Sequence, residues 1–513
     1  MLLPLLSLLA LAACRDEDLP PDVGELEPES AKQESAEPPT VSGPTILGRR
    51  TPNAYTPEAM RRALAELSQT NKSLSLDTAD IEATHLYLRF APRDSSDVMA
   101  LEADTSIFFT EVPMDYEVAA IGDYYRDPSL PDTVPTYMYC TARVGQSLPD
   151  VPHETLSELF LMEEANVYED AEALAANKRS DLLWEQLEAK SRELAGLDAD
   201  DEQPANKSKW TPGGVLKYEE SDGKVKAIEG VPVRIHRGFV THQCCTDAKG
   251  VFSFSRRRHH VRYYIKWRRD CFHIRGLGKV VKVAETTLAD NSKSRIERTI
   301  TDNGHAAWKY ASVFRPAHYY FYHYDKCGLS RPDENNLIIR LSAREPDDRV
   351  SRYFCGGGFI LPDVFVYYRK LSSSRDIFRS TIHEIAHCAH HKWSRSTYRH
   401  CDKIVKESWA RGIAYYVARE VDYGDVGERF SSIYTGLVLS LTRDDFENSV
   451  KTSEGTVKYH LKKFTLSEVE RCLKGCTTWN QWRDKLKNTE NGKGQENEID
   501  KVFDAWAKYD GGK

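Results

Sequence analysis

Apolar residues in the first third of the chain repeat with two different periods, which predicts helices mixed with strands. Segments with apolar residues at spacings of three and four, as on one face of a helix, are 57–71, 95–104 and 154–161, and segments in which apolar and polar residues alternate, as in strands, are 85–90, 106–110 and 137–144. The mixture predicts a small α+β domain over residues 46–165. A helical pattern over 164–196, followed by polar residues, predicts a helical linker over residues 166–204.

Residues 210–275 alternate between apolar and other residues more strictly. The apolar positions are Val231, Val233 and Ile235 in one run and Val261, Tyr263, Ile265 and Trp267 in another. Because Gly and Asp turns separate such runs, we predict several short strands that form a β-sandwich domain over residues 205–285. The stretch GVPVRIHR…TDAKGVFSF…VRYYIKW resembles the carboxypeptidase-regulatory, prealbumin-like domain often appended to exported enzymes, which implies the same sandwich fold.

The sandwich region also carries a cluster of basic residues. They are Arg256, Arg257, Arg258, His259, His260, Arg262, Lys266, Arg268 and Arg269. One interpretation is a patch that binds an anionic glycan, a lipid head group or another polyanion. The other interpretation, which we favour, is a solvated strand face, since the basic residues beyond 261 mostly occupy the outward positions of the alternating pattern.

Composition and charge exclude two classes of protein. The 513 residues include 70 Lys and Arg against 78 Asp and Glu, a net charge of −8. A mildly acidic chain is a poor candidate for a dedicated nucleic-acid binder, so no nucleic-acid partner is expected. No stretch after residue 14 has the roughly 18–20 apolar residues that span a bilayer, which excludes a multi-pass membrane protein.

The first fourteen residues, MLLPLLSLLALAAC, are an apolar run that ends in small residues, as a signal peptide does. The last four resemble the lipobox of bacterial lipoproteins, although no Lys or Arg precedes the run. The resemblance implies that residues 1–14 are a lipoprotein signal peptide and that Cys14 is lipidated. The protein would then be an exported, membrane-anchored lipoprotein of the cell envelope. The alternative is a short apolar N-terminus with a chance cysteine.

Residues 15–45 follow the predicted lipidation site. They are rich in Asp, Glu and Pro and have few large apolar side chains. Such a segment buries too little apolar surface to order itself, so we predict a disordered acidic tether.

The pattern that carries chemistry lies within residues 374–391, where apolar residues recur at helical spacing. His383-Glu384-Ile385-Ala386-His387 is an H-E-x-x-H sequence. Positions i and i+4 of a helix lie one turn apart on the same face, so His383 and His387 could both bind one metal ion. Glu384, next to the first histidine, could then act on a water at that metal. The alternative is a helix with surface histidines.

A third ligand decides between these alternatives. The metzincin pattern requires Gly at position 390 and His at 393, whereas the chain has His390 and Trp393. Glu407 follows His387 by twenty positions and belongs to a second helical pattern, on a face lined by Ile and Ala. A carboxylate on such a face is costly to bury unless it is paired or coordinated. The alternative is that Glu407 forms an ion pair with Arg411, four positions later on the same helix.

The stretch HEIAHCAHHKW…KESWARGIAYYV resembles the core of a gluzincin metallopeptidase. The resemblance implies a zincin-like metallopeptidase domain over residues 286–513, with Zn²⁺ held by His383, His387 and Glu407 and with Glu384 as general base on the zinc-bound water. Gluzincins also supply a Tyr or His to the oxyanion, and the candidates are Tyr415, Tyr416, Tyr423, Tyr434 and His460. Residues 340–368 could supply an edge strand that holds extended peptide.

The predicted fold class is multidomain α+β. It combines the small N-terminal α+β domain, the prealbumin-like β-sandwich and a mainly helical C-terminal zincin-like metallopeptidase domain. Two functions compete. One is zinc-dependent hydrolysis of a peptide or protein substrate by a lipid-anchored envelope enzyme. The other is a non-enzymatic envelope binding or scaffold protein with a structural or vestigial metal site. The presence of Glu384 favours the enzyme, because a structural metal site does not require a general base beside its ligands.

Overall fold

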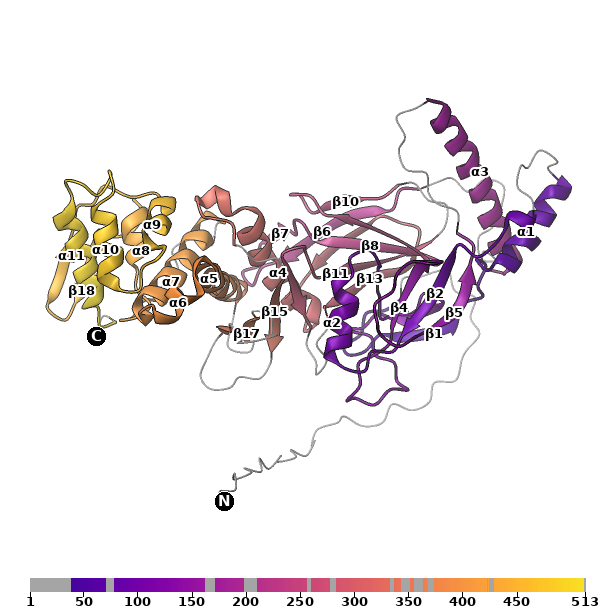
Figure 1. The fold of residues 1–513 in the computed structure, drawn as a ribbon, viewed down its shortest axis with the longest axis horizontal. Coiled ribbons are helices and arrows are strands. Elements are labelled where there is room, and N and C mark those ends of the chain that lie inside the picture. Colours follow the sequence, from indigo (N-terminus) through magenta and orange to yellow (C-terminus); the bar gives the residue numbers. More distant parts are fainter. Residues whose placement is uncertain are drawn as a thin grey trace, which may run out of the picture. The chain divides into compact units, whose positions relative to one another are not determined.

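The computed structural model describes residues 38–70, 78–161, 171–197, 210–255, 260–276, 283–332, 336–342, 351–354, 363–367, 373–421, 423 and 429–511. Residues Glu37–Lys513 form one compact unit with a mixed α+β fold (Figure 1). The predicted signal peptide, Cys14 and most of the predicted tether lie outside the described residues. The last residues of the predicted tether belong to the folded unit, because the Val41 N–H donates to the Ile121 carbonyl at 2.8 Å.

A three-stranded antiparallel sheet, in the order β4-β2-β5, organises the N-terminal α+β region. The elements here are β1 (Ile46–Arg50), α1 (Pro57–Thr70), β2 (His85–Phe90), α2 (Ser95–Ala103), β3 (Tyr116–Ala120), β4 (Met138–Arg143) and β5 (His153–Leu159). Strands β1 and β3 form a separate antiparallel pair. Helices α1 and α2 and strands β2 and β4 confirm the corresponding predictions.

Two predictions for this region are wrong. Residues 154–161, predicted as a helix, contain strand β5, which pairs with β2 along its whole length. Most of β5 is exposed, so the spacing of its apolar residues does not mark the buried face of a helix. Residues 106–110, predicted as a strand, make only one bridge, between Thr110 and Tyr139. Their alternation reflects burial of Ile107 and Phe109 in a core shared with α2 rather than strand pairing.

The predicted linker helix is α3 (Ala171–Leu194), which packs against α1. Leu187 is fully buried. The Glu188 carboxylate accepts a hydrogen bond of 2.7 Å from the Tyr55 hydroxyl. The helix is therefore docked on the N-terminal region by both apolar and polar contacts.

Two four-stranded sheets follow, as the alternating pattern predicts. One has the order β10-β6-β14 with β7 also paired to β6, and the other has the order β13-β11-β8-β9. The strands are β6 (Gly213–Glu219), β7 (Val225–Ala227), β8 (Pro232–Arg237), β9 (Val240–Cys245), β10 (Val251–Ser253), β11 (Val261–Lys266), β13 (Glu285–Ser292) and β14 (Ile296–Ile300). Phe252 of one sheet packs edge-on against Tyr263 of the other, with ring centroids 6.1 Å apart. The paired strands extend to Ile300, past residue 285.

The basic residues of β11 are neither a solvated face nor a free patch. Arg262 and Lys266 are buried. Arg262 Nε donates to Asp290 at 2.8 Å, and Lys266 Nζ pairs with Glu285 at 3.3 Å. Arg262 also donates to the Tyr116 carbonyl at 2.6 Å. The outward face of this sheet is thus covered by the N-terminal region, which the alternating pattern alone could not indicate.

A mixed sheet and a set of helices complete the chain. In the sheet, with order β12-β15-β17-β16, the first three strands are parallel and β16 is antiparallel to β17 at the edge. The elements are β12 (Phe272–Arg275), α4 (Ala306–Tyr322), β15 (Leu337–Ser342), β16 (Ser351–Phe354), β17 (Asp363–Tyr367), α5 (Ser374–Trp393), α6 (Arg395–His400), α7 (Lys403–Glu420), α8 (Leu437–Thr442), β18 (Ser449–Thr452), β19 (Gly455–Lys458), α9 (Leu466–Leu473), α10 (Trp479–Lys487) and α11 (Glu496–Ala507). Helix α5 contacts β16, β17, α4 and α7.

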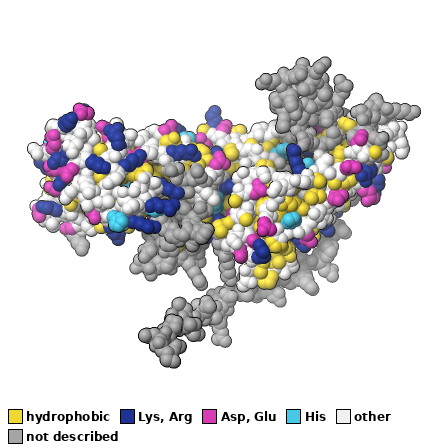
Figure 2. All heavy atoms as spheres, viewed as in Figure 1, with side chains coloured by type: hydrophobic (Ala, Val, Ile, Leu, Met, Phe, Trp, Pro, Cys, Tyr) yellow, Lys and Arg dark blue, Asp and Glu magenta, His cyan; other side chains and the backbone are white. Residues whose placement is uncertain are grey.

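The surface differs between the two ends of the chain. Charged side chains of both signs are mixed over the C-terminal helices α9, α10 and α11, whereas hydrophobic side chains gather over the N-terminal region in the same view (Figure 2). Mixed charges of this kind are typical of a solvated face. No helix in the described part of the chain has the length and apolar character needed to cross a membrane.

Candidate metal centre

Helix α5 carries the H-E-x-x-H sequence, and its own residues fix where it begins. The Ser373 side chain caps the helix by accepting a hydrogen bond of 3.1 Å from the Asp376 N–H. Ile377, Ile382 and Ile385 are buried and hold one side of the helix in the core. The predicted helix over 374–391 is therefore confirmed, two residues longer than expected.

The three predicted metal ligands come together between α5 and α7. The Nε2 atoms of His383 and His387 are 3.1 Å apart, and Glu407 Oε2 is 3.2 Å from each of them. The side chains of His383, His387 and Glu407 are only 12, 6 and 17 % exposed. Three donor atoms thus form a nearly equilateral triangle that solvent still reaches.

The triangle has the size that a metal ion requires. Zinc binds its ligands at about 2.0–2.1 Å in a tetrahedral arrangement, which sets neighbouring donor atoms about 3.3–3.4 Å apart. The separations of 3.1–3.2 Å are close to this value. Two imidazole nitrogens and one carboxylate oxygen suit zinc and other borderline divalent ions. The residues present therefore fit a metal ion with one position open to a further ligand.

The electrostatics favour the metal-binding protonation states of Glu407 and His383, whereas at His387 the hydrogen bond and charge of Glu407 outweigh burial and raise the pKa. Burial alone would raise the pKa of Glu407, but hydrogen bonds from His383 and His387 outweigh it and hold that pKa well below its usual range. Burial lowers the pKa of His383 to about 4. An ionised carboxylate beside a neutral imidazole is the form in which both groups are ligands.

Small residues allow α7 to bring Glu407 close to α5. Ala386 on α5 and Ala410 and Ala414 on α7 are buried where the two helices pack. The alternative pair between Glu407 and Arg411 does not form among the described residues. Arg411 instead donates to the Tyr415 hydroxyl at 3.2 Å, and its guanidinium lies 4.7 Å from the centre of the Tyr434 ring.

Glu384 and Tyr434 lie next to the three ligands. Glu384 is 4 % exposed, and its charge acts on the pKa values of His387 and Tyr434. The Tyr434 ring centroid is 5.9 Å from that of His383. Burial, together with the charges of Glu407 and Glu384, raises the pKa of the Tyr434 hydroxyl. Tyr434 therefore keeps its proton and can donate a hydrogen bond.

The other oxyanion candidates have different partners. The Tyr423 hydroxyl donates to Glu220, and Tyr415 donates to the Arg429 carbonyl. Tyr416 lies under the Arg443 guanidinium. The His460 backbone N–H donates to Glu498. Residue spacing could not choose among the five, whereas the fold brings the Tyr434 ring within 5.9 Å of the His383 ring.

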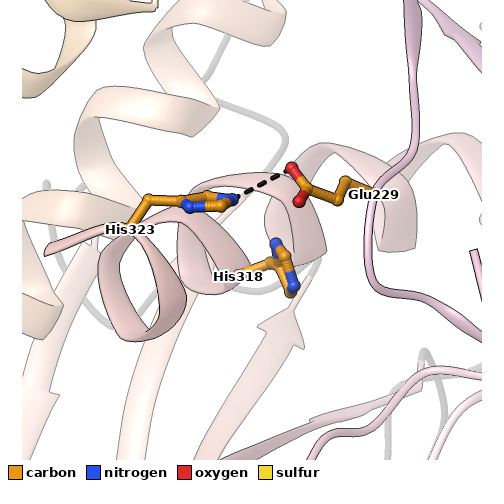
Figure 3. Close-up of side chains that lie close together, drawn as sticks. All are labelled: Glu229, His318 and His323. Atoms are coloured by element: carbon orange, nitrogen blue, oxygen red, sulfur yellow. Dashed lines mark hydrogen bonds and ion pairs between the residues drawn. The ribbon is translucent and has the colours of Figure 1, made fainter. Parts of the chain in front are cut away.

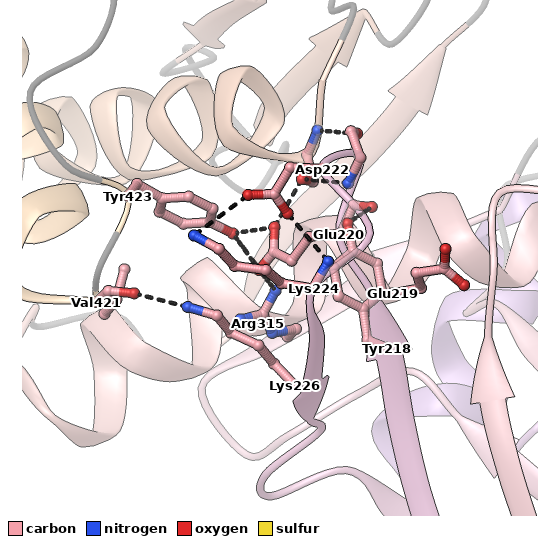
Figure 4. A network of polar contacts seen from close by, with 12 residues as sticks. Tyr218, Glu219, Glu220, Asp222, Lys224, Lys226, Arg315, Val421 and Tyr423 are labelled. Carbon is pink, nitrogen blue, oxygen red and sulfur yellow. Dashed lines mark hydrogen bonds and ion pairs between the residues drawn. The ribbon is translucent and has the colours of Figure 1, made fainter.

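A buried polar network anchors the start of α5 (Figure 4). The Glu220 carboxylate accepts from the Ser374 hydroxyl at 2.6 Å, from Arg315 Nη1 at 2.7 Å and from the Tyr423 hydroxyl at 2.8 Å. Ser221 adds a reciprocal bond, since its hydroxyl accepts from the Ser374 N–H at 2.7 Å. The network joins the end of β6, helix α4 and the start of α5, and it fixes α5 relative to both.

A second group, Glu229, His318 and His323, could also hold a metal ion. No sequence pattern indicated this group, because the two histidines are five positions apart, a spacing that does not share a helix face, and Glu229 is remote in the chain.

No protein-family model matches the chain, and no curated protein sequence matches it. Function is therefore inferred from the residues themselves.

Proposed function

We propose that the protein is a zinc-dependent metallopeptidase anchored at the cell envelope. The observation that supports this is the triangle of His383, His387 and Glu407 donor atoms, 3.1–3.2 Å apart, with Glu384 next to it. A structural zinc site is usually closed by four protein ligands, whereas a catalytic site keeps one position open. Three ligands beside a further carboxylate are the arrangement expected of a hydrolytic centre.

Zinc bound at these ligands would polarise the scissile carbonyl and lower the pKa of a water molecule to about 7. Glu384 accepts the proton of the attacking water and delivers it to the leaving amine. The Tyr434 hydroxyl donates a hydrogen bond to the oxygen on which negative charge develops. Arg411, over the Tyr434 ring, holds that ring in position.

Strand β16 is the proposed binding edge for the substrate. It is the last strand of its sheet, it runs antiparallel to β17, and it packs beside α5. An extended peptide adds to such an edge through main-chain hydrogen bonds. This position would carry the peptide past the metal centre on the neighbouring helix. Parts of the predicted edge region, residues 343–350, 355–362 and 368, lie outside the described residues.

The test of the general base is Glu384→Gln. Glutamine keeps the size and polarity of the side chain but cannot accept the proton. We expect the variant to keep its zinc and its melting temperature while its turnover of any cleaved peptide falls by about 10²–10⁴-fold or more. Digestion of a peptide library by both proteins, with zinc content measured in parallel, gives the comparison.

Two results would contradict the proposal. Cleavage by Glu384→Gln at the wild-type rate would exclude Glu384 as the base. A wild-type protein that holds zinc and cleaves nothing across a broad library would favour the non-enzymatic binding or scaffold protein. The proposed anchor is tested separately by the intact mass of the membrane fraction, since a lipidated Cys14 adds the mass of its acyl chains and an unmodified Cys14 excludes the anchor.

A further inference from the structure

A second group of metal-binding side chains lies outside the candidate metal centre (Figure 3). Glu229 comes from the segment between β7 and β8, and His318 and His323 come from the last turns of α4 and the residue that ends it. Donor atoms of the three side chains lie within 4.8 Å of one another. His323 Nε2 is 3.0 Å from Glu229 Oε2. The set of one glutamate and two histidines is the same as in the α5–α7 centre.

The backbone is shaped so that these side chains meet. Gly230 has a φ of +74°, and a Cβ on it would come within 1.9 Å of His318 Nε2. Only glycine allows that imidazole to approach the chain beside Glu229. His323 is the C-cap residue of α4, with φ −130° and ψ 19°. Because it has left the helical conformation, its side chain turns toward the same side as His318.

The ring nitrogens of His318 make no hydrogen bond to any described residue, although this side chain is only 6 % exposed. The ring stacks on Tyr322 and Phe314, with centroids 4.8 and 5.8 Å apart. The ring nitrogens are not among the fully buried polar atoms that lack a partner, so an ion from solvent can reach this imidazole. Coordination of a cation shared with Glu229 would give the ring a polar partner.

We propose that Glu229, His318 and His323 bind a second divalent cation of the zinc class. The ion would fasten the β7–β8 segment to the end of α4. Helix α4 packs against α5, so the ion would stabilise the layer on which the metal-centre helix rests. Three protein ligands leave the remaining position to water.

The surroundings make this site weaker than the first. Arg269 Nη1 donates to the Gly230 carbonyl at 2.6 Å, and the positive charges of Arg269 and Lys326 act on His318. Cations near a cation site lower its affinity. A graded chelator should therefore remove this ion first.

The experiment measures zinc content of the full-length protein along a chelator series. Wild type is expected to hold two ions per chain and to lose them in two steps. Glu229→Gln still accepts a hydrogen bond from His323 but lacks the ligand charge, and we expect it to lower the affinity for the first-lost ion at least tenfold. His400→Ala, which removes an exposed histidine of α6, is the matched control and should change neither step.

A variant without the first centre separates this proposal from the peptidase. The double variant His383→Ala, His387→Ala should keep one ion and lose it at the chelator concentration of the first wild-type step. Cobalt(II) loaded into this variant should give a visible absorption band that the further change Glu229→Gln removes. A double variant that binds neither zinc nor cobalt would overturn the second site and leave the peptidase proposal untouched. Unchanged binding in Glu229→Gln would also overturn it.

Discussion

The two His/Glu clusters use the same residue types and differ in how the backbone holds them. In the α5–α7 centre, His383 and His387 stand one turn apart on one helix and Glu407 faces them from another, with donor atoms 3.1–3.2 Å apart. The Glu229 cluster joins a helix end to the segment between two strands, and its His323 Nε2 and Glu229 Oε2 atoms are 3.0 Å apart. All three ligands of the first cluster stand on regular helices, whereas only His318 of the second lies within a helix.

The surroundings of the clusters differ as much as their geometry. Glu384 and Tyr434 flank the first, where we propose that they act as base and hydrogen-bond donor. The second has Arg269 and Lys326 beside it, and their positive charges add to burial in lowering the pKa of His318. A shared ligand set therefore indicates metal binding, and the neighbouring side chains decide between chemistry and structural support.

Glu407→Ala should give the largest effect, because it removes a ligand from the more rigid cluster. We expect zinc affinity at this centre to fall by more than the roughly 10–100-fold that outer partners of ligands contribute, and peptide turnover to fall to background. Titration with a competing chelator and a peptide assay measure the two quantities. Glu420→Ala, at the exposed end of the same helix, is the control. Unchanged zinc occupancy in Glu407→Ala would remove Glu407 from the site.

Tyr434→Phe tests whether the neighbours of the first centre take part in its chemistry. Loss of a donor to a developing oxyanion typically lowers kcat by about 10²–10³-fold, and we expect a decrease of this order with zinc content unchanged. The control is Tyr416→Phe, whose ring lies 5.2 Å from the Arg443 guanidinium carbon. An equal loss in both variants would assign no oxyanion role to Tyr434.

Glu220→Gln tests how far the rigidity of the first cluster depends on the buried network. The change leaves Arg315 buried without its charged partner, and breaking a buried ion pair costs about 3–5 kcal/mol of unfolding free energy. Urea denaturation measures the cost. Glu219→Gln is the control, because that side chain points away from the network (Figure 4) and should change stability by less than about 0.5 kcal/mol. Similar values for the two variants would contradict the anchoring role.

His323→Gln should give the smallest effect when no metal is present. The His323 and Glu229 side chains are 18 and 36 % exposed, and a partly exposed pair contributes about 1 kcal/mol or less. If the second site binds zinc, the difference in melting temperature from wild type should widen when zinc is added, since wild type gains the binding energy of the ion. A difference that stays the same with and without zinc would argue against the second site.

The sequence could predict the histidine pair of the first cluster because both residues lie on one helix. Helical spacing alone put His383 and His387 on one face, and the apolar face around Glu407 marked it as a group that needed a partner. Strand β2 was predicted at its observed limits because strict alternation specifies both strand and buried face. The prealbumin-like and zincin-like resemblances stay predictions, supported by a mixed α+β fold.

What the sequence could not predict depends on contacts between distant segments. Strand β5 is defined by its pairing with β2 rather than by its own residues. The Glu229 cluster requires a helix end and a left-handed glycine in another segment. Arg262 occupies an outward position of the alternating pattern, which predicts a surface residue. It is buried because the N-terminal region covers it, and it pairs there with Asp290.

The N-terminal region covers one face of the β13-β11-β8-β9 sheet. The stability of the remaining chain therefore depends on that region. Asp290 accepts from the Val118 N–H at 2.9 Å, and Glu285 accepts from the Thr110 hydroxyl at 3.0 Å. A chain shortened to begin after α3 would expose these carboxylates and their basic partners to water together with apolar surface. A protease cut between α3 and β6, by contrast, would leave every one of these bonds intact, so the two fragments should stay together through purification.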